Sequence, residues 1–125
     1  MNDLAAALAE LAPFRLTSPA EDVSVYGFRG THLELTVPNL PMEGEGDDSF
    51  FTDCVDGTLE SWVAPIDTEP GDAFYGYTGP GYVEEFWILD VEGTRLMIAA
   101  ERSADSPSED IEELRSILES IRIEP

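Results

Sequence analysis

The chain contains no lysine, and its only basic side chains are six arginines, set against 27 aspartates and glutamates. The formal net charge at pH 7 is therefore −21 over 125 residues. A charge of this size repels polyanions, which argues against nucleic acid and anionic membrane surfaces as partners. Cations, basic or neutral protein surfaces and small neutral ligands remain as candidate partners.

Histidine and cysteine occur once each, as His32 and Cys54. A single cysteine excludes an intrachain disulfide, and one Cys with one His cannot provide the ligand spacing of a structural zinc site. His32 is out of phase with Leu33 and Leu35, so its side chain should point away from the face that these leucines bury. Neither His32 nor Cys54 has a neighbouring activating motif, which favours a structural role over a Cys–His nucleophile.

Long apolar runs are also missing, and none approaches the ~18 residues needed to cross a bilayer. The first residues, Met1-Asn2-Asp3, carry no positive charge, so we expect no signal peptide. Whether the chain is a full-length protein or a domain of a longer, membrane-tethered one stays open. With 42% hydrophobic residues, the chain is apolar enough to fold as one acidic domain over residues 1–125.

Three acidic residues, Glu43, Glu45 and Asp47, alternate as the first ligands of a calcium loop do. An EF-hand loop beginning at Glu43 would need glycine in place of Asp48 and glutamate in place of Cys54. The motif therefore fails. We predict no dedicated metal site and no cofactor.

The first half of the chain shows one helical and one β pattern. Leu4, Leu8 and Leu11 share a helical face before Pro13, which predicts a short helix over residues 3–12.

Apolar residues alternate over 23–25 and again over 33–37, on either side of Arg29-Gly30. This pattern predicts a β-hairpin that turns at Arg29-Gly30 and buries one face. The polar residues 17–22 that precede it are expected to form a loop.

The strongest β signals come later, over residues 82–91 and 94–101, which are joined at Glu92-Gly93. Both segments are apolar on both faces, so we expect them in the middle of a sheet. A shorter strand is predicted over residues 59–64.

The C-terminal helix is expected to follow Ser106, which can cap it, with Pro107 in its first position and Glu109 completing a capping box. Residues 121–123 then form a short strand or a docked tail. The apolar stripe of the helix consists of Ile111, Leu114, Ile117, Leu118 and Ile121.

Together these elements predict an α+β fold. An antiparallel sheet of about five to six strands carries the C-terminal helix on one face, and a short helix precedes it.

Two segments, residues 86–96 (FWILDVEGTRL) and 119–125 (ESIRIEP), resemble the C-terminal domain of uncharacterised actinobacterial membrane-associated or secreted proteins. The resemblance implies an extracytoplasmic location, and it implies no activity and no functional residues. The order of elements is also similar to the PsbP-like fold, an analogy that concerns the fold alone.

Aromatic side chains interleaved with glycine and proline mark the candidate recognition surface. Amphipathic aromatic rings give a large contact area at low entropic cost, although the same segment could be a hairpin whose tyrosines cover the edge of the core. The candidate contact residues are Trp62, Phe74, Tyr75, Tyr77 and Tyr82.

We therefore expect a non-enzymatic extracytoplasmic interaction or ligand-sensing module, with a protein or a small neutral ligand as its partner. One alternative is an acidic decoy that mimics nucleic acid and binds a basic partner, which carboxylates clustered on one rigid face would favour. Another is a carboxylate-based enzyme, which needs two acids held in a cleft. Glu84 and Glu85 are adjacent on a predicted strand and should face opposite sides, so they are unsuited to a shared site.

Overall fold

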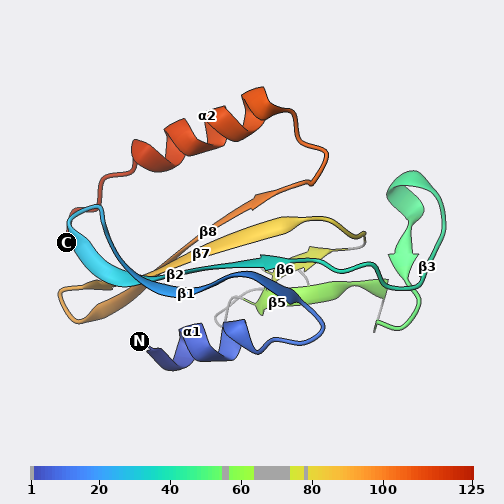
Figure 1. Ribbon diagram of the computed structural model, residues 1–125, viewed down its shortest axis with the longest axis horizontal. Coiled ribbons are helices and arrows are strands. Elements are labelled where there is room, and N and C mark those ends of the chain that lie inside the picture. The colour runs from blue at the N-terminus through green and yellow to red at the C-terminus, as the bar shows by residue number, and fades with distance from the viewer. Residues whose placement is uncertain (1, 55–56, 64–73, 78) are drawn as a thin grey trace.

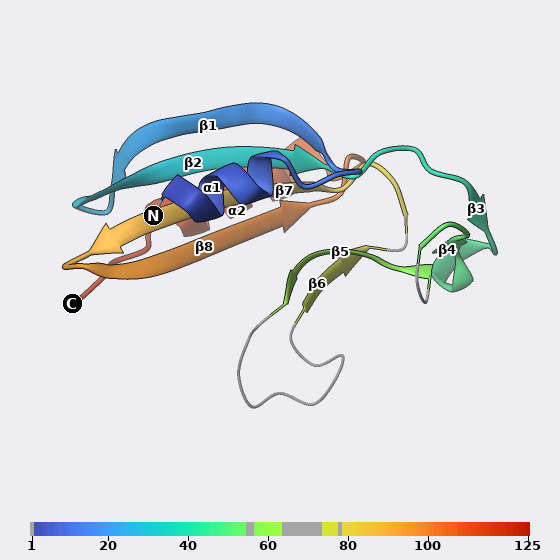
Figure 2. The same ribbon diagram turned by 90° about the horizontal axis from the view of Figure 1, so that it is seen from below.

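The computed structural model describes residues 2–54, 57–63, 74–77 and 79–125. Its centre is a four-stranded antiparallel sheet with the strand order β1-β2-β7-β8 and a helix packed on each face (Figures 1 and 2). The α+β class and the antiparallel sheet are confirmed. The elements are α1 (Asn2–Ala9), β1 (Arg15–Val25), β2 (Phe28–Thr36), β7 (Val83–Val91), β8 (Thr94–Arg102) and α2 (Ser108–Glu119).

Two strand pairs lie outside this sheet. The first joins β3 (Met42–Glu43) to β4 (Phe50–Phe51), with a 3₁₀ helix, η1 (Gly46–Asp48), between them. The second joins β5 (Leu59–Val63) to β6 (Phe74–Tyr77). The additional strands therefore form separate pairs and do not widen the main sheet beyond four strands.

The face of the sheet under α1 is the first core. Period-two alternation places Leu33, Leu35, Phe86 and Ile88 on this face, and each is at most 1% exposed. Ala5 and Leu8 of α1 complete the cluster. Packing of its apolar stripe on this row of aliphatic and aromatic side chains therefore stabilises the short helix.

The opposite face packs against α2. Trp87 and Leu89 alternate with the residues of the first core and form a cluster with Ala100 and with Leu118 of α2. Ile121 and Ile123 pack against the same cluster, so the C-terminal segment is a docked tail. No helix in the described part of the chain is long and apolar enough to cross a membrane.

The predicted loop over residues 17–22 is wrong, because β1 runs through it. The register with β2 shifts between Leu16 and Ser18 and again between Ser18 and Glu21, which accommodates Pro19. Since β1 is an edge strand, a residue without an N–H and two irregular pairings cost the sheet little. A polar composition therefore does not prevent this segment from pairing.

The first hairpin does not turn at Arg29-Gly30 as predicted. The turn is Tyr26-Gly27, with φ of 54° and 83°, and Gly30 lies inside β2 opposite Leu89. Two successive residues with positive φ are typical of the type I′ turn, whose twist matches that of the flanking strands.

The second hairpin turns at Glu92-Gly93 as predicted, with φ of 52° and 86°. Its turn is closed further by Asp90 Oδ1, which accepts a hydrogen bond of 2.7 Å from the Gly93 N–H. The two turns lie at the same end of the sheet (Figure 1).

The predicted cap of α2 is also wrong. Pro107 occupies the N-cap position and no side chain caps the helix, whereas the Ser106 N–H donates to the Ser103 carbonyl in the preceding turn. Glu109 and Asp110 in the first turn place negative charge at the positive end of the helix dipole.

Candidate functional site

The predicted aromatic surface is only partly described. Strands β5 and β6 pair Trp62 with Tyr75 and Val63 with Phe74, and the side chains of these residues lie outside the described part of the chain. Tyr82 is 38% exposed, as a recognition residue would be.

Tyr77 is 4% exposed and belongs to a core cluster with Val37, Phe51 and Leu59. Tyr77 therefore does not belong to an exposed recognition surface, and its burial agrees with the alternative in which tyrosines of this segment cover the edge of the core. Its ring lies 5.2 Å from that of Tyr82, between ring centroids, so a buried and an exposed tyrosine are in contact here. The glycine-rich sequence around Tyr77 does not indicate which of the two tyrosines is buried in the core.

The Tyr77 hydroxyl lies beside two glutamates of the main sheet. It donates a hydrogen bond of 2.9 Å to Glu101 Oε2, and Glu84, which is 1% exposed, is the cross-strand neighbour of Glu101. Burial, the charge of Glu84 and the hydrogen bond to Glu101 raise the pKa of Tyr77 above its usual value. The tyrosine therefore stays protonated and connects the β5–β6 pair to the sheet.

On the opposite face, Glu85 is the centre of an ionic cluster. Arg115 of α2 donates two hydrogen bonds to its carboxylate, of 3.0 and 2.7 Å, and Arg102 donates a third of 3.4 Å. His32 Nε2 lies 3.8 Å from Glu85 Oε2. Burial alone would raise the pKa of Glu85, but the hydrogen bonds and charge of Arg115, with the charges of His32 and Arg102, lower it below its usual value.

The single histidine, His32, belongs to this ionic cluster. As predicted, His32 points away from Leu33 and Leu35, and its ring lies 4.9 Å from that of Trp87. Cys54 packs against the cluster that contains Tyr77, on the other side of the sheet. The structure therefore does not bring Cys54 and His32 together as a nucleophile and base.

The two buried glutamates also lie on opposite faces, as predicted. Glu84 faces Tyr77 and Glu101, whereas Glu85 faces Arg115. They do not form a pair of carboxylates across one cleft.

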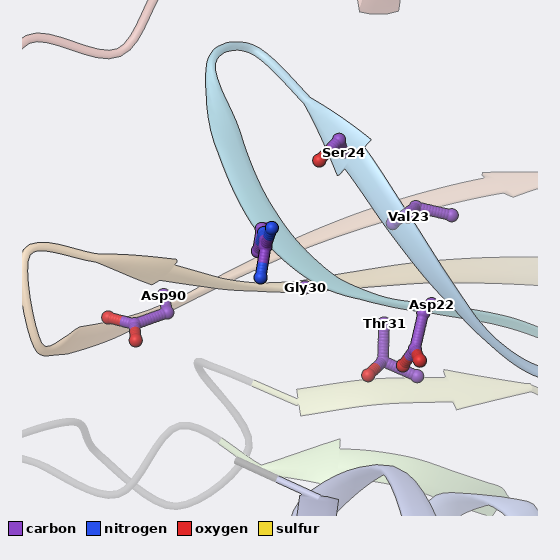
Figure 3. Close-up of a pocket in the computed structure, with 7 residues that line it drawn as sticks. Asp22, Val23, Ser24, Gly30, Thr31 and Asp90 are labelled. Atoms are coloured by element: carbon purple, nitrogen blue, oxygen red, sulfur yellow. The ribbon is translucent and has the colours of Figure 1, made fainter.

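An open groove at the turn end of the sheet has a volume of about 600 Å³ and is formed by β1, β2 and β7 (Figure 3). We call it the turn-end groove. The pairings of Asp22 with Thr31 and of Ser24 with Arg29 place four of its polar side chains on one face of the sheet. Its lining residues are Asp22, Val23, Ser24, Arg29, Gly30, Thr31 and Asp90.

Gly30 lines this groove from within β2. A Cβ atom at this position would lie 2.1 Å from the Ile88 carbonyl oxygen and 2.8 Å from Leu89 Cδ2, so only glycine fits. Its backbone can thereby approach β7 closely. Asp22, Arg29 and Asp90 line the groove, which therefore offers two carboxylates and one guanidinium, with Asp90 Oδ1 already accepting from the Gly93 N–H.

The sequence prediction missed this groove. With a loop at Asp22 and a turn at Arg29, neither side chain would belong to a sheet surface. The available signal was Tyr26-Gly27, because a turn there pairs Asp22 with Thr31 and brings the polar residues into register.

A smaller hollow of about 330 Å³ lies between the end of β8 and the start of α2. Tyr82, Arg102 and Ser106 line it, with acidic Glu101 and Asp110. Arg102 is already held by Glu85 and lies 3.7 Å from Glu34. This hollow therefore offers fewer free polar groups than the turn-end groove.

Within the described residues, no group of three or more histidine, cysteine, aspartate or glutamate side chains is arranged to hold a metal ion. Comparisons of the chain with protein-family models, with curated proteins and with solved structures give no match.

Proposed function

We propose that the chain is a non-enzymatic interaction module that binds a cationic ligand, or a basic side chain of a partner, in the turn-end groove. The observation that carries this proposal is the position of Asp22 and Asp90, two carboxylates that line one open groove. The net charge of −21 adds a long-range field that concentrates cations near the protein. Arg29 adds a donor for a carboxylate, so a zwitterionic ligand would also find a partner for each of its charges.

The placement of the reactive side chains supports binding over catalysis. His32 lies against Trp87 and Glu85, and the Glu85 carboxylate is occupied by Arg115. Cys54 packs in a separate cluster. A nucleophile with an adjacent base, which covalent catalysis needs, is not formed by these residues.

The acidic decoy is a second candidate function, and α2 is the observation that favours it. The helix is a regular element with five exposed carboxylates, four of them in its first half, and such an array mimics phosphates better than acids in loops do. A basic partner would then bind α2, not the groove. The exposed acids of the helix are Glu109, Asp110, Glu112, Glu113 and Glu119.

An extracytoplasmic location is part of the proposal and rests on the resemblance of residues 86–96 and 119–125 to secreted or membrane-associated proteins. Binding of small cations or basic peptides would suit a module exposed to the surroundings of the cell.

Amide chemical shifts of the labelled chain during a titration with L-argininamide, at about 150 mM NaCl to screen diffuse attraction, test the proposal. We expect the shifts to concentrate around Asp22, Arg29 and Asp90. Asp22→Asn and Asp90→Asn should each weaken binding by about threefold to tenfold, the loss expected for one exposed charge contact. Asparagine at position 90 keeps an acceptor for the Gly93 N–H, so the turn is preserved.

The matched control is Asp53→Asn, which removes an exposed acid outside the groove. An equal loss of affinity in this variant would show diffuse attraction and contradict the groove. Titration with an oligoarginine peptide separates the second candidate, because shifts centred on α2 and absent from the groove would favour the decoy.

A further inference from the structure

The two edges of the main sheet differ in how they are protected against pairing. Edge strand β1 contains Pro19, two register shifts and the charged pair Glu21-Asp22. Proline, bulges and charges are the devices by which proteins prevent edge strands from pairing with other chains. Strand β8, at the other edge, pairs with β7 over all nine residues without a register shift and contains no proline.

The outer edge of β8 has no paired strand in the described part of the chain. Figure 2 shows this edge along the margin of the sheet, with the β5–β6 pair near its C-terminal end, where the Tyr77 hydroxyl donates to Glu101. Leu96 is 37% exposed, and Met97, Ile98 and Ala99 are partly exposed. A regularly paired strand with an apolar middle and unpaired backbone groups on its outer side is a template for adding another strand.

The charges of β8 indicate which strand it fits. Arg95, Glu101 and Arg102 give it a formal charge of +1, in a chain whose net charge is −21. Arg95 and Glu101 are equidistant from the central Ile98 and lie on the same face of the sheet. In an antiparallel pair of two β8 strands centred on Ile98, Arg95 of each copy therefore stands opposite Glu101 of the other. Because Glu101 Oε2 accepts the hydrogen bond from Tyr77, Arg95 would bind the other oxygen, Oε1.

We propose that β8 pairs with β8 of a second copy of this chain, with Ile98 on the two-fold axis. The arrangement joins two four-stranded sheets into one continuous sheet, and it forms the Arg95–Glu101 pair twice. A two-fold interface needs a surface that is complementary to itself, and the charge pattern of β8 meets this condition. The proposal does not rest on the turn-end groove, because no residue of β8 lines that groove, although Arg95 is the cross-strand neighbour of Asp90.

Sedimentation equilibrium of the full chain tests the proposal, at low salt and at about 1 M NaCl, where the Debye length of about 3 Å suppresses repulsion between the two acidic copies. We expect a monomer–dimer equilibrium that is tighter at high salt. Leu96→Lys should raise the dissociation constant at least about tenfold, since it places a charge at the apolar edge.

Leu16→Lys is the matched control, because Leu16 is 40% exposed on the opposite edge strand β1. This variant should dimerise as the unchanged chain does. Circular dichroism of both variants checks that each remains folded. A dimer that Leu16→Lys breaks and Leu96→Lys preserves would place the interface on β1 and overturn the proposal.

Two charge reversals test the register. Arg95→Glu and Glu101→Arg should each weaken self-association, because each homodimer then sets like charges opposite one another. The two variants mixed together should associate again, since every pair in the mixed dimer is of opposite charge. If the unchanged chain dimerises and the mixture does not recover, the Ile98-centred register is wrong. A chain that stays monomeric at every concentration and salt overturns the pairing with a second copy, and leaves the edge to a strand of another protein or to none.

Discussion

Glu84 and Glu85 are neighbours on β7 and are almost equally buried, at 1% and 3% exposure, yet they meet opposite surroundings. Glu85 faces two arginines and a histidine, whereas Glu84 faces the Tyr77 hydroxyl and the carboxylate of Glu101. The difference arises from strand alternation alone, because adjacent residues of a strand point to opposite faces.

The comparison shows how a protein with few cations uses them. Of its six arginines, Arg102 and Arg115 both contact Glu85. A buried carboxylate without compensation is costly, and Arg115 compensates this one while holding α2 to the sheet. On the other face a tyrosine takes the position beside the carboxylates. Different interactions therefore hold the two elements to the sheet. Ion pairs hold α2 on one face, and a hydrogen bond from a neutral hydroxyl holds the β5–β6 pair on the other.

The largest expected loss of stability comes from the apolar contact between α2 and the sheet, next to the Arg115–Glu85 ion pair. Leu118→Ala should lower the free energy of unfolding by about 2–5 kcal/mol, the range for truncating a buried leucine. Leu118 is 8% exposed, whereas its neighbour Ile117 is 55% exposed. Ile117→Ala is the control and should cost under about 0.5 kcal/mol, as exposed substitutions do. Urea denaturation gives both values. Equal costs would mean that α2 packs by another face.

Removing the cation from Glu85 is the next prediction. Arg115→Ala leaves a buried carboxylate with less compensation and should cost about 2–3 kcal/mol, below the full range for breaking a buried ion pair. The reduction reflects the 47% exposure of the Arg115 side chain, which lets water screen the pair. Arg122→Ala, in the exposed part of the tail, should change stability by under about 0.5 kcal/mol. If both arginines give the same small loss, the cluster around Glu85 does not stabilise the fold.

The contribution of the Glu85 ion pairs to the free energy of unfolding should also depend on pH. Because the folded-state pKa of Glu85 lies below the usual value of 4.5, its contribution is fully present above that pH and is lost as the pH falls through the lowered pKa. Glu85→Gln should cost about 1.5–2.5 kcal/mol at pH 7, the scale of hydrogen bonds to a charged group. The difference between the unchanged chain and the variant should shrink below pH 4.5. A difference that is constant from pH 7 to pH 3 would contradict the lowered pKa.

The alternation that separates these glutamates was visible in the sequence, and so was most of the sheet. The strand patterns around Phe86 and Ile98 are long and strongly apolar, and the structure places both strands as predicted. The pattern at Val23 correctly indicated a hairpin but not its turn, because alternation marks which residues face the core and does not mark where the chain reverses. The φ values of Tyr26 and Gly27 decide that, and tyrosine is an uncommon residue at a positive φ.

The candidate site was less accessible to prediction, because it depends on pairings between distant segments. The partner of Glu85 comes from α2, 30 residues later, and the partner of Tyr77 comes from β8, 24 residues later. Local sequence patterns carry no information on such pairs. Tyr77 and Tyr82 lie in the same glycine-rich segment, and only tertiary packing makes one buried and the other exposed.

The next prediction concerns the other face of the sheet, where the hydroxyl of Tyr77 bonds to Glu101. Tyr77→Phe removes the hydrogen bond to Glu101 without opening a cavity. It should cost about 1 kcal/mol, less than a bond to a buried charged group, because the exposed Glu101 can bond to water instead. Tyr82→Phe is the matched control, because Tyr82 is 38% exposed and its hydroxyl can bond to water. Thermal denaturation of the two variants measures the difference. No loss in Tyr77→Phe would show that the hydroxyl does not connect the β5–β6 pair to the sheet.

The smallest change in stability is expected for substitution of Glu84, and it should be a gain or no change where substitution of Glu85 gives a loss. Glu84 and Glu101 are directly opposite in the β7–β8 register, where two like charges destabilise an antiparallel pair. Glu84→Gln removes that repulsion and keeps a side chain of the same shape, whose amide oxygen can still accept a hydrogen bond from the Tyr77 hydroxyl. Stability at pH 7 should therefore be unchanged or rise by about 0.5 kcal/mol. The neighbouring Glu85→Gln should lower it, because there the substitution removes an attraction to Arg115. The two variants measured side by side by urea denaturation therefore test the comparison directly. A loss at Glu84 as large as the loss at Glu85 would mean that both buried carboxylates are held by attraction, and the contrast between the ionic and the hydroxyl-bonded face would no longer hold.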